Sequence, residues 1–321
     1  MTVEQMEAEE EKVISPADLF RKWEQQQWRL SDLRPADDRA DWQAMGGYGR
    51  GELETMISGF VFGEAAVSAT LSPLADAAPS LDAQQYLCTQ IADEARHTRF
   101  FADYLSQVRG GEESREEVIA EAWSGSADAV SSIFDEGLRL RTGRLREAPD
   151  DRRAWYTAVT FYHLMAEGVL AMSVLGSMLS MVRQLRGRLA VLDTGLRNVI
   201  RDESRHMAFG MYAAREGVNT GHRQAVLQAI LDAVPQVVPA LVAPERRLPG
   251  TSLPPMRAVI AAQHERRYAG ARRTLLRRME LIGLAEATEE AGWLWDRARK
   301  EAFSTYESLH GAPHPVDDAA S

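Results

Sequence analysis

The sequence predicts an all-α fold built on a bundle of four long helices, with additional helices before and after it along the chain. Long stretches repeat apolar residues every three or four positions, which is the period of a helix with one buried face. No stretch alternates β-branched and polar residues over the length of a strand, and no Asn-Gly or Asp-Gly turn joins two such stretches. The 321 residues, 45% of them hydrophobic, suffice for one domain with a sizeable core.

Composition excludes several classes of protein. A formal net charge of -10 argues against nucleic acid or an anionic membrane surface as the main partner. The single cysteine, Cys88, excludes an intrachain disulfide framework and a cysteine-rich metal site. We find no apolar run near the roughly 20 residues that cross a bilayer, and no secretion signal in the acidic N-terminus. We therefore expect no membrane span and a cytoplasmic location.

The four long helices of the bundle are expected over residues 51–71, 82–108, 152–185 and from 188 to about 217. The stretch "SPLADAAPS" ends the first of them, and Gly110 and Gly111 end the second. Gly187 separates the third helix from the fourth. Residues 112–151 are charged and less regular, and we expect them to form a crossover that contains a helix of its own.

Shorter elements precede and follow the bundle. Ser15 and Pro16 predict the cap and first turn of a short leading helix. After the bundle, "VPQVVPALVAPERRLPGTSLPP" carries six prolines and is expected to be an irregular connection. Two further helices are expected after it, over residues 256–282 and 285–309.

One five-residue phrase, Asp-Glu-x-Arg-His, occurs twice. It stands as "DEARH" at residues 93–97 and as "DESRH" at residues 202–206. Residues three apart lie on one face of a helix, so each phrase presents a glutamate and a histidine to one point. A single such pair is more often a surface pair than a set of ligands. Its repetition on the second and fourth long helices favours ligands.

A glutamate in apolar surroundings precedes each phrase on the previous long helix. Glu64 in "FVFGEAAVSA" stands 30 residues before Glu94, and Glu167 in "FYHLMAEGVLA" stands 36 residues before Glu203. Uncompensated burial of a carboxylate costs several kcal/mol, so neither glutamate suits an ordinary core. One Glu from each of two helices and Glu-x-x-His from each of two others is the ligand set of bundles that bind two iron or manganese ions.

We therefore predict a site for two metal ions, iron with iron or manganese with iron. Four carboxylates balance most of the charge of two divalent cations, and carboxylate-rich sites favour these metals over zinc. One ion is expected on Glu64 and His97, the other on Glu167 and His206, with bridges from Glu94 and Glu203. Asp93 and Asp202 are expected to reach across the bundle to the outer ring nitrogens, Asp202 to His97 and Asp93 to His206. The alternative for both aspartates is an ordinary helix salt bridge with the arginine three residues later.

The residues from Gly63 to Val218 resemble the ferritin-like superfamily of dinuclear carboxylate proteins that activate oxygen. The closest resemblance is to the ligand-binding oxidases related to the ribonucleotide reductase small subunit. It implies a ferritin-like four-helix bundle with additional N- and C-terminal helices. We expect a flexible acidic N-terminus (1–15), a single ferritin-like domain (16–310) with its metal-binding core at about 51–218, and a flexible tail (311–321).

Three positions separate this chain from other members of the superfamily. Radical-forming reductase subunits typically carry a tyrosine where this chain has Phe101, one turn after His97. Multicomponent monooxygenases typically carry a threonine at the position of Ala171. Arylamine N-oxygenases add a histidine ligand at the position of Val199. Together these positions disfavour all three activities.

The resemblance to the ligand-binding oxidases extends to a valine and a tyrosine, here Val67 and Tyr162. In that family, oxygen activation removes two hydrogens and joins the valine Cβ to the tyrosine oxygen, and a long-chain fatty acid is held near the metals. Val67 shares the helix face of Glu64, but Tyr162 lies about 140° from Glu167 on an ideal α-helix. Without the resemblance, both residues would be interpreted as packed core.

The expected function is a two-electron oxidation coupled to the reduction of dioxygen. The sequence does not decide which group is oxidised: the protein itself, a bound fatty acid-like ligand or a small metabolite. The resemblance also implies an external electron donor and a homodimer. The alternative is an oxygenase (hydroxylase, desaturase or N-oxygenase) acting on a biosynthetic intermediate. A reductase subunit or an iron-storage protein is less favoured, the latter because the chain has substantial helices beyond the bundle.

Four of the remaining histidines are expected on the surface: His222, His264, His310 and His314. His163, which follows Tyr162, is instead expected near the metal ligands or buried in the core.

Overall fold

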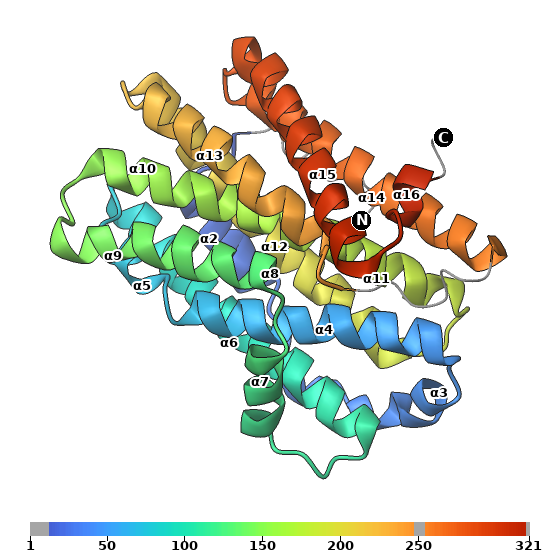
Figure 1. Cartoon of the computed structure of the whole chain (residues 1–321). Helices are drawn as coiled ribbons and strands as arrows, with labels where there is room; N and C mark the ends of the chain where they lie inside the picture. Colours follow the sequence, from blue (N-terminus) through green and yellow to red (C-terminus); the bar gives the residue numbers. More distant parts are fainter. Residues whose placement is uncertain (1–12, 247–253, 319–321) are drawn as a thin grey trace.

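The computed structural model describes residues 13–246 and 254–318, and every regular element in these ranges is a helix (Figure 1). Four long helical segments form the bundle: α4 (Gly47–Ser68), α6 (Leu81–Arg109), the continuous run of α10 (Arg152–Thr160), η4 (Phe161–Ala171) and α11 (Met172–Gln184), and α12 (Ala190–Asn219). They correspond to the four predicted helices, with ends shifted by a few residues. The all-α, ferritin-like bundle is therefore confirmed.

Local sequence explains where several helices begin and end. The hydroxyl of Ser80 caps α6 by accepting a hydrogen bond from the backbone N–H three residues later. Gly110 and Gly111 end α6 with positive φ angles, which glycine adopts without a steric penalty. The leading helix α2 (Pro16–Gln25) has Ser15 as its cap and Pro16 in its first turn, as predicted.

Residues 112–151 form the predicted crossover, which contains several short helices instead of one. They are α7 (Arg115–Ser124), α8 (Asp128–Ser132), the π-helical η3 (Ile133–Arg139) and α9 (Leu140–Glu147). The remaining short elements are η1 (Leu30–Asp32), η2 (Pro35–Asp38), α3 (Arg39–Gln43), α5 (Ser72–Asp76) and η5 (Ala285–Ala287).

The proline-rich segment is only partly irregular, which corrects the sequence prediction. A helix that was not predicted, α13 (Arg223–Val242), runs through both Pro235 and Pro239. Each proline removes one backbone hydrogen bond of the helix. Apolar side chains such as Val234 and Val238 are buried where α13 packs on η4, α10 and α15, and this burial offsets the lost bonds. Residues 247–253 of the expected connection lie outside the described residues, as do residues 1–12 of the expected N-terminal segment.

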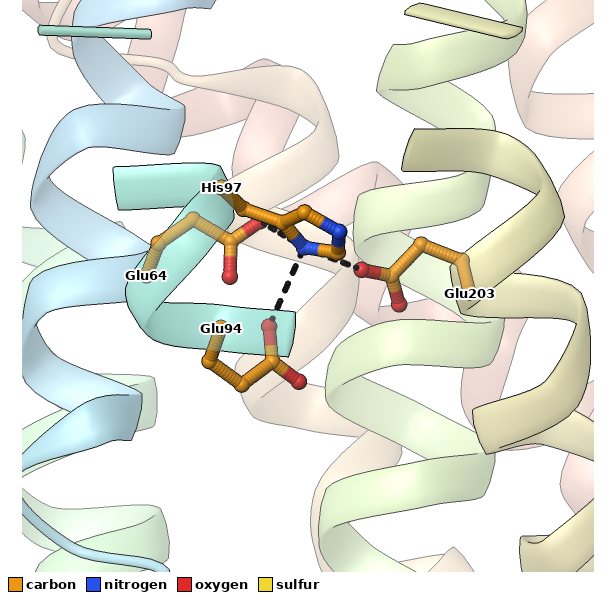
Figure 2. A group of neighbouring side chains, drawn as sticks. All are labelled: Glu64, Glu94, His97 and Glu203. Atoms are coloured by element: carbon orange, nitrogen blue, oxygen red, sulfur yellow. Dashed lines mark ion pairs between the residues drawn. The ribbon is translucent and has the colours of Figure 1, made fainter. Parts of the chain in front are cut away.

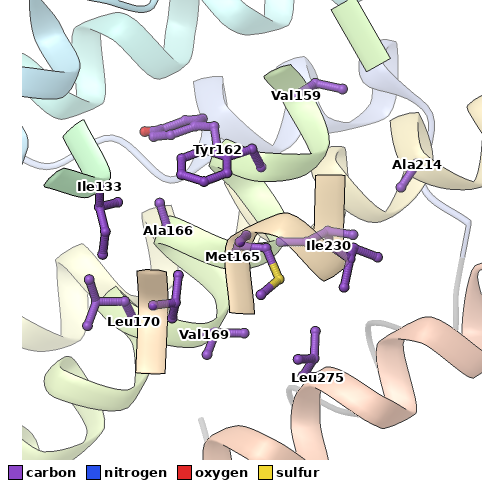
Figure 3. Close-up of a cluster of buried hydrophobic side chains, with 14 of the residues drawn as sticks. Ile133, Val159, Tyr162, Met165, Ala166, Val169, Leu170, Ala214, Ile230 and Leu275 are labelled. Atoms are coloured by element: carbon purple, nitrogen blue, oxygen red, sulfur yellow. The ribbon is translucent and has the colours of Figure 1, made fainter. Parts of the chain in front are cut away.

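A layer of three helices covers the third helix of the bundle. It consists of α13 and α14 (Pro254–Leu281), which pack on α10, η4 and α11, and of α15 (Thr288–His310), which packs on α13 and α14 (Figure 1). Figure 3 shows the apolar contact beneath this layer, with Met165 and Val169 from η4, Ile230 from α13 and Leu275 from α14. The layer keeps water away from one side of η4, the helix that carries Glu167.

Two histidines that were expected on the surface are buried. His264 of α14 is 8% exposed and His314 is 1% exposed. The ring of His314 stacks on Phe303 with centroids 4.5 Å apart and lies 5.8 Å from the ring of His264. Residues 311–318, where the sequence predicts a flexible tail, include the short helix α16 (Pro315–Asp318). A histidine between two prolines gives no helical periodicity, so nothing local indicated this packing.

Two helical runs are long and apolar enough to cross a membrane: residues Arg152–Gln184 and Arg223–Val242. The most apolar stretches of these runs are 56% and 61% buried inside the protein, as is usual for core helices of a bundle. His163 and Glu167 interrupt the apolar sequence of the first run, and Pro235 and Pro239 interrupt that of the second.

Candidate metal centre

The four helices of the bundle bring the six candidate ligands together. Glu64 comes from α4, and Glu167 comes from η4. The other four are the Glu-x-x-His pairs of α6 and α12, whose members face the bundle interior together because they are three residues apart. None of the six is more than 6% exposed: Glu64, Glu94, His97, Glu167, Glu203 and His206.

One group of donor atoms surrounds His97 (Figure 2). The Nδ1 atom of His97 lies 3.7 Å from Oε1 of Glu64, 3.3 Å from Oε2 of Glu94 and 3.3 Å from Oε1 of Glu203. One donor atom from each of these four residues lies within 4.8 Å of all the others. A single ion with metal–ligand distances of about 2.0–2.6 Å would span such a group.

A second group surrounds His206. Its Nδ1 atom lies 3.3 Å from Oε1 of Glu94, 3.5 Å from Oε1 of Glu167 and 3.4 Å from Oε2 of Glu203. Glu94 and Glu203 therefore each direct one oxygen to one histidine and the second oxygen to the other histidine. This is the arrangement that a carboxylate bridging two ions requires.

Burial perturbs the protonation of these residues. Burial raises the pKa of Glu64 well above its usual value, and the neighbouring charge of Glu94 raises it further. Burial raises the pKa of Glu167 in the same way, with Glu203 adding to the effect. Burial alone would lower the pKa of His97 and His206, but the surrounding carboxylates outweigh it and raise both pKa values. Four carboxylates in a dry site require cations, either protons or metal ions, to neutralise them.

Several donor atoms of the two groups have no hydrogen-bond partner. They are Nδ1 of His97 and His206 and Oε2 of Glu94, Glu167 and Glu203. A buried polar atom without a partner costs about 1–3 kcal/mol. Because all five atoms belong to residues that already face one another, the side chains present fit a pair of metal ions.

The outer nitrogens of both histidines face aspartates from the opposite phrase. Nε2 of His97 lies 3.2 Å from Oδ2 of Asp202, and Nε2 of His206 lies 3.4 Å from Oδ2 of Asp93. Both aspartates are fully buried. A histidine that donates its outer N–H to a carboxylate keeps its inner nitrogen free as an electron-pair donor.

Each aspartate also pairs with arginine, so the two interpretations considered for them coexist. Arg205 donates to Oδ1 of Asp202 at 2.6 Å and to Oδ2 of Asp93 at 3.0 Å. Arg96 forms a further ion pair with Asp93. One guanidinium therefore connects the two aspartates, and through them the two histidines.

Two tryptophans that the sequence analysis did not single out complete this outer layer. The indole N–H of Trp28 donates to Asp202 at 2.7 Å, and that of Trp23 donates to Asp93 at 3.0 Å. Both lie in or just after α2, which packs on α6 and α12. No spacing rule links this leading segment to a site some 70 to 180 residues later, so only the fold reveals the contacts.

Tyr162 reaches the metal centre because η4 is a π-helix. Its hydroxyl donates to Oε1 of Glu94 at 2.9 Å, and burial, followed by the charges of Glu167 and Glu94, raises the pKa of Tyr162 well above its usual value. Each N–H of a π-helix bonds to the carbonyl five residues earlier, so residues five apart, such as Tyr162 and Glu167, lie on one side. The angle of about 140° expected for an ideal α-helix does not apply to this segment.

Gln90, which the sequence analysis missed, is fully buried beside the metal centre. Its Nε2 donates to Oε1 of Glu167 at 2.8 Å, and its Oε1 lies 2.9 Å from Nε2 of His163. The other ring nitrogen of His163 lies 3.0 Å from the carbonyl oxygen of Val159, and burial lowers the pKa of His163 to about 3. Gln90 stands four residues before Glu94 and therefore on the same helix face, which is the signal that would have identified it.

A cavity of about 750 Å³ opens onto the metal centre. Glu64, Glu167 and Glu203 lie in its lining, and so do Val67 and Tyr162. Much of the remaining wall is apolar: Met56, Phe60, Phe62, Val130, Phe134, Leu170, Val174 and Leu241. Partly exposed charged residues, including Arg109 and Glu121, also line it. The cavity thus joins carboxylates to an apolar chamber with a charged edge.

Fold and site together define a ferritin-like helical bundle with a buried carboxylate–histidine group suited to two metal ions. The sequence model of the ribonucleotide reductase small chain family matches residues 15–239, which is more than half of the chain. The chain therefore belongs to the ribonucleotide reductase small chain family, and the resemblance stated from the sequence is confirmed.

Solved structures of R2-like ligand-binding oxidases share the fold. A mutant with an aerobically reconstituted Mn/Fe cofactor is 20% identical, with a TM-score of 0.61 over 89% of this chain and 92% of that chain. A mutant with an anaerobically reconstituted Mn/Fe cofactor is also 20% identical, with a TM-score of 0.61 over 90% and 92%. A third structure, with an aerobically reconstituted metal cofactor after photoconversion, is 19% identical, with a TM-score of 0.59 over 92% of both chains. At this identity the likeness establishes the fold.

Proposed function

We propose that the chain is an oxidase that holds two metal ions and couples the reduction of dioxygen to a two-electron oxidation of an organic group. One observation carries this proposal. The Nδ1 atoms of His97 and His206 are buried without partners among carboxylate oxygens, while their outer nitrogens face aspartates. Carboxylate-rich donor sets favour iron and manganese, and the solved relatives are described with Mn/Fe cofactors. The pair is accordingly Fe/Fe or Mn/Fe.

Each ion would have one terminal carboxylate and one imidazole. Glu64 and His97 would hold the first, Glu167 and His206 the second, and Glu94 and Glu203 would bridge them. When bound, the ions supply the redox chemistry with dioxygen. Asp202 and Asp93 orient the imidazoles, and Gln90 holds Glu167 in place through its amide.

The cavity supports a ligand of the fatty acid type. Its apolar wall would bury a hydrocarbon chain, and its connection to the carboxylates would bring one end of that chain to the metal ions. The solved relatives are named as ligand-binding oxidases, which favours the same use of this cavity. An external electron donor and a homodimer complete the proposal by resemblance.

Val67 and Tyr162 are the protein groups that we propose to be oxidised. Joining the Cβ of Val67 to the phenolic oxygen of Tyr162 breaks one C–H and one O–H bond and removes two electrons and two protons, which dioxygen accepts. Both residues line the same cavity, and the hydrogen bond from Tyr162 to Glu94 gives the departing proton a carboxylate acceptor.

Elemental analysis and peptide mass spectrometry test the proposal after aerobic loading with iron and manganese. We expect two ions per chain and a joined pair of peptides containing Val67 and Tyr162, lighter than their sum by two hydrogens. Tyr162→Phe should keep the ions and lose the joined peptide, because Phe lacks the oxygen. His97→Ala should lose ions.

The outcomes separate the possibilities. A chain that retains no transition metal contradicts the whole proposal. A chain that retains two ions but yields only unlinked peptides contradicts the cross-link alone. In that case, oxygen-dependent turnover of an added amine or alkane would identify the oxygenase of a biosynthetic intermediate, which the open 750 Å³ cavity also accommodates.

A further inference from the structure

A second pocket, of about 260 Å³, lies between α2, α11 and α12. The charged residues of its lining are all basic: Lys22, Arg183, Arg197, Arg201 and Arg205. No acidic side chain lines it. Positive charges this close together repel one another, so the lining of the pocket favours a bound anion.

The inner part of the pocket holds two guanidinium groups with unused donors. Arg205 is only 4% exposed, and its Nε atom has no hydrogen-bond partner. The Nε atom of Arg201 is likewise buried and has no partner. A buried donor that bonds to nothing costs about 1–3 kcal/mol. Two such donors side by side along α12 are therefore better explained by an acceptor that binds there.

The positive charge of the pocket is only partly neutralised. Arg197 pairs with Asp193, and Arg205 pairs with the two aspartates of the metal centre. Arg201 donates to the backbone carbonyl of Gln26, and within the described residues neither Arg201 nor Arg183 forms an ion pair with a carboxylate.

The rest of the lining restricts what the acceptor can be. Gln26 accepts a hydrogen bond from Arg205 at 2.6 Å through its carbonyl oxygen, which leaves its amide nitrogen as a further donor. One wall is apolar: Ile14, Leu19, Leu179, Ile200 and Ala208. A pocket of this size admits a small metabolite, with its charged end on the arginines and a short apolar part on this wall.

We infer that this pocket binds a small organic oxyanion, a carboxylate or a phosphate ester, through Arg201, Arg205 and Arg183. The site is separate from the 750 Å³ cavity, with which it shares no lining residue. Arg205 belongs to both this pocket and the outer layer of the metal centre. The oxyanion is thus held one side chain away from the aspartates that face the histidines.

Calorimetric titration of the full chain tests the site, with orthophosphate and hexanoate as probes and with chloride keeping the ionic strength constant. For at least one of the two probes, we expect saturable binding of one molecule per chain that Arg201→Gln weakens, because binding of hexanoate in the separate 750 Å³ cavity would not depend on Arg201. Tighter binding of orthophosphate identifies a phosphate group as the natural ligand, and tighter binding of hexanoate identifies a carboxylate. The absence of saturable binding for both probes overturns the inference.

Three charge-matched variants complete the test. Arg201→Gln should raise the Kd at least about tenfold, because it removes a charge-assisted bond to the anion. Arg183→Gln should raise it several-fold, and since Arg183 is exposed this variant tests the site without disturbing the fold. Arg266→Gln removes the same charge from the exposed face of α14 and should leave the Kd unchanged. Equal Kd values in all three variants overturn the inference, because they would show only a general effect of charge.

Discussion

Asp93 and Asp202 each contact a histidine, an arginine and a tryptophan. Buried carboxylates need this many hydrogen-bond partners, because each oxygen lone pair without a partner in a dry environment adds to the free-energy cost of burial. It also fixes which nitrogen of each imidazole carries the proton. The aspartates therefore control the availability of the inner nitrogens, although they lie outside the two groups of donor atoms.

Replacing Asp202 with Asn should weaken metal binding about 10- to 100-fold, as loss of an outer partner of a ligating histidine typically does. The amide is nearly isosteric but uncharged, so it accepts more weakly from His97 and Arg205. Competition with a chromogenic chelator measures the affinity directly. Asp103→Asn, which removes a charge from a surface pair with Arg115, is the control and should leave affinity unchanged. Equal affinities in the two variants would contradict the role assigned to Asp202.

The residue-level predictions from sequence depended on the regularity of the local helix. Spacing of three residues on α6 and α12 identified the Glu-x-x-His pairs, because both segments are ordinary α-helices. Gln90 obeyed the same rule but was overlooked, since an amide does not stand out as a ligand. Trp23 and Trp28 obeyed no such rule, because their contacts with the site arise from tertiary packing alone.

At the scale of elements, two helices departed from sequence expectation for opposite reasons. In η4, an apolar helix changed its hydrogen-bond register without a proline to indicate it, and thereby brought Tyr162 beside Glu94. In α13, prolines that normally end a helix were accommodated, because the helix is buried by the bundle on one side and by α15 on another. Periodicity predicts that a helix exists; neighbouring helices decide its register and its ends.

Pro235→Ala should stabilise the protein by about 1–3 kcal/mol, because it restores a backbone donor in the middle of α13 and removes the clash of the ring with the preceding turn. Pro235 is exposed, so no packing is lost. Urea unfolding of the metal-free protein measures the change. Gln224→Ala, at an exposed position in the first turn of the same helix, is the control and should change the stability little. A loss of stability in Pro235→Ala would show that α13 requires the local bend.

At the scale of the whole molecule, the C-terminal helices make stability depend on pH. Burial, with the charges of Arg267 and Arg299 adding to it, lowers the pKa of His314 to about 4, and burial also lowers the pKa of His264. An unfolded chain protonates its histidines near pH 6.5. Below that pH, His314 binds a proton in the unfolded state but stays unprotonated in the folded state. The stability that the neutral His314 contributes is therefore fully present above about pH 6.5 and is lost as the pH falls toward 4.

His314→Phe should therefore lose less stability than the wild type between pH 7 and pH 4.5, by a difference on the order of 2 kcal/mol. Phenylalanine keeps the stacking on Phe303 but cannot be protonated. Denaturant unfolding at both pH values gives the difference, and groups of the metal centre cancel because both proteins contain them. His222→Phe, at a half-buried position between the end of α12 and the start of α13, serves as the control. Parallel losses in wild type and His314→Phe would contradict the assignment.

The guanidinium of Arg205 has one more consequence. The chain repeats the same five letters in two helices, yet only the second arginine bonds to both aspartates, whereas Arg96 bonds to Asp93 alone. Asp93 therefore faces two positive groups and Asp202 faces one, so the two imidazoles behind them differ in basicity. The repeated motif therefore forms two metal sites that are not equivalent. If two different metals were supplied, each would prefer one of the two sites, and a chelator would remove the metal from one site before the other.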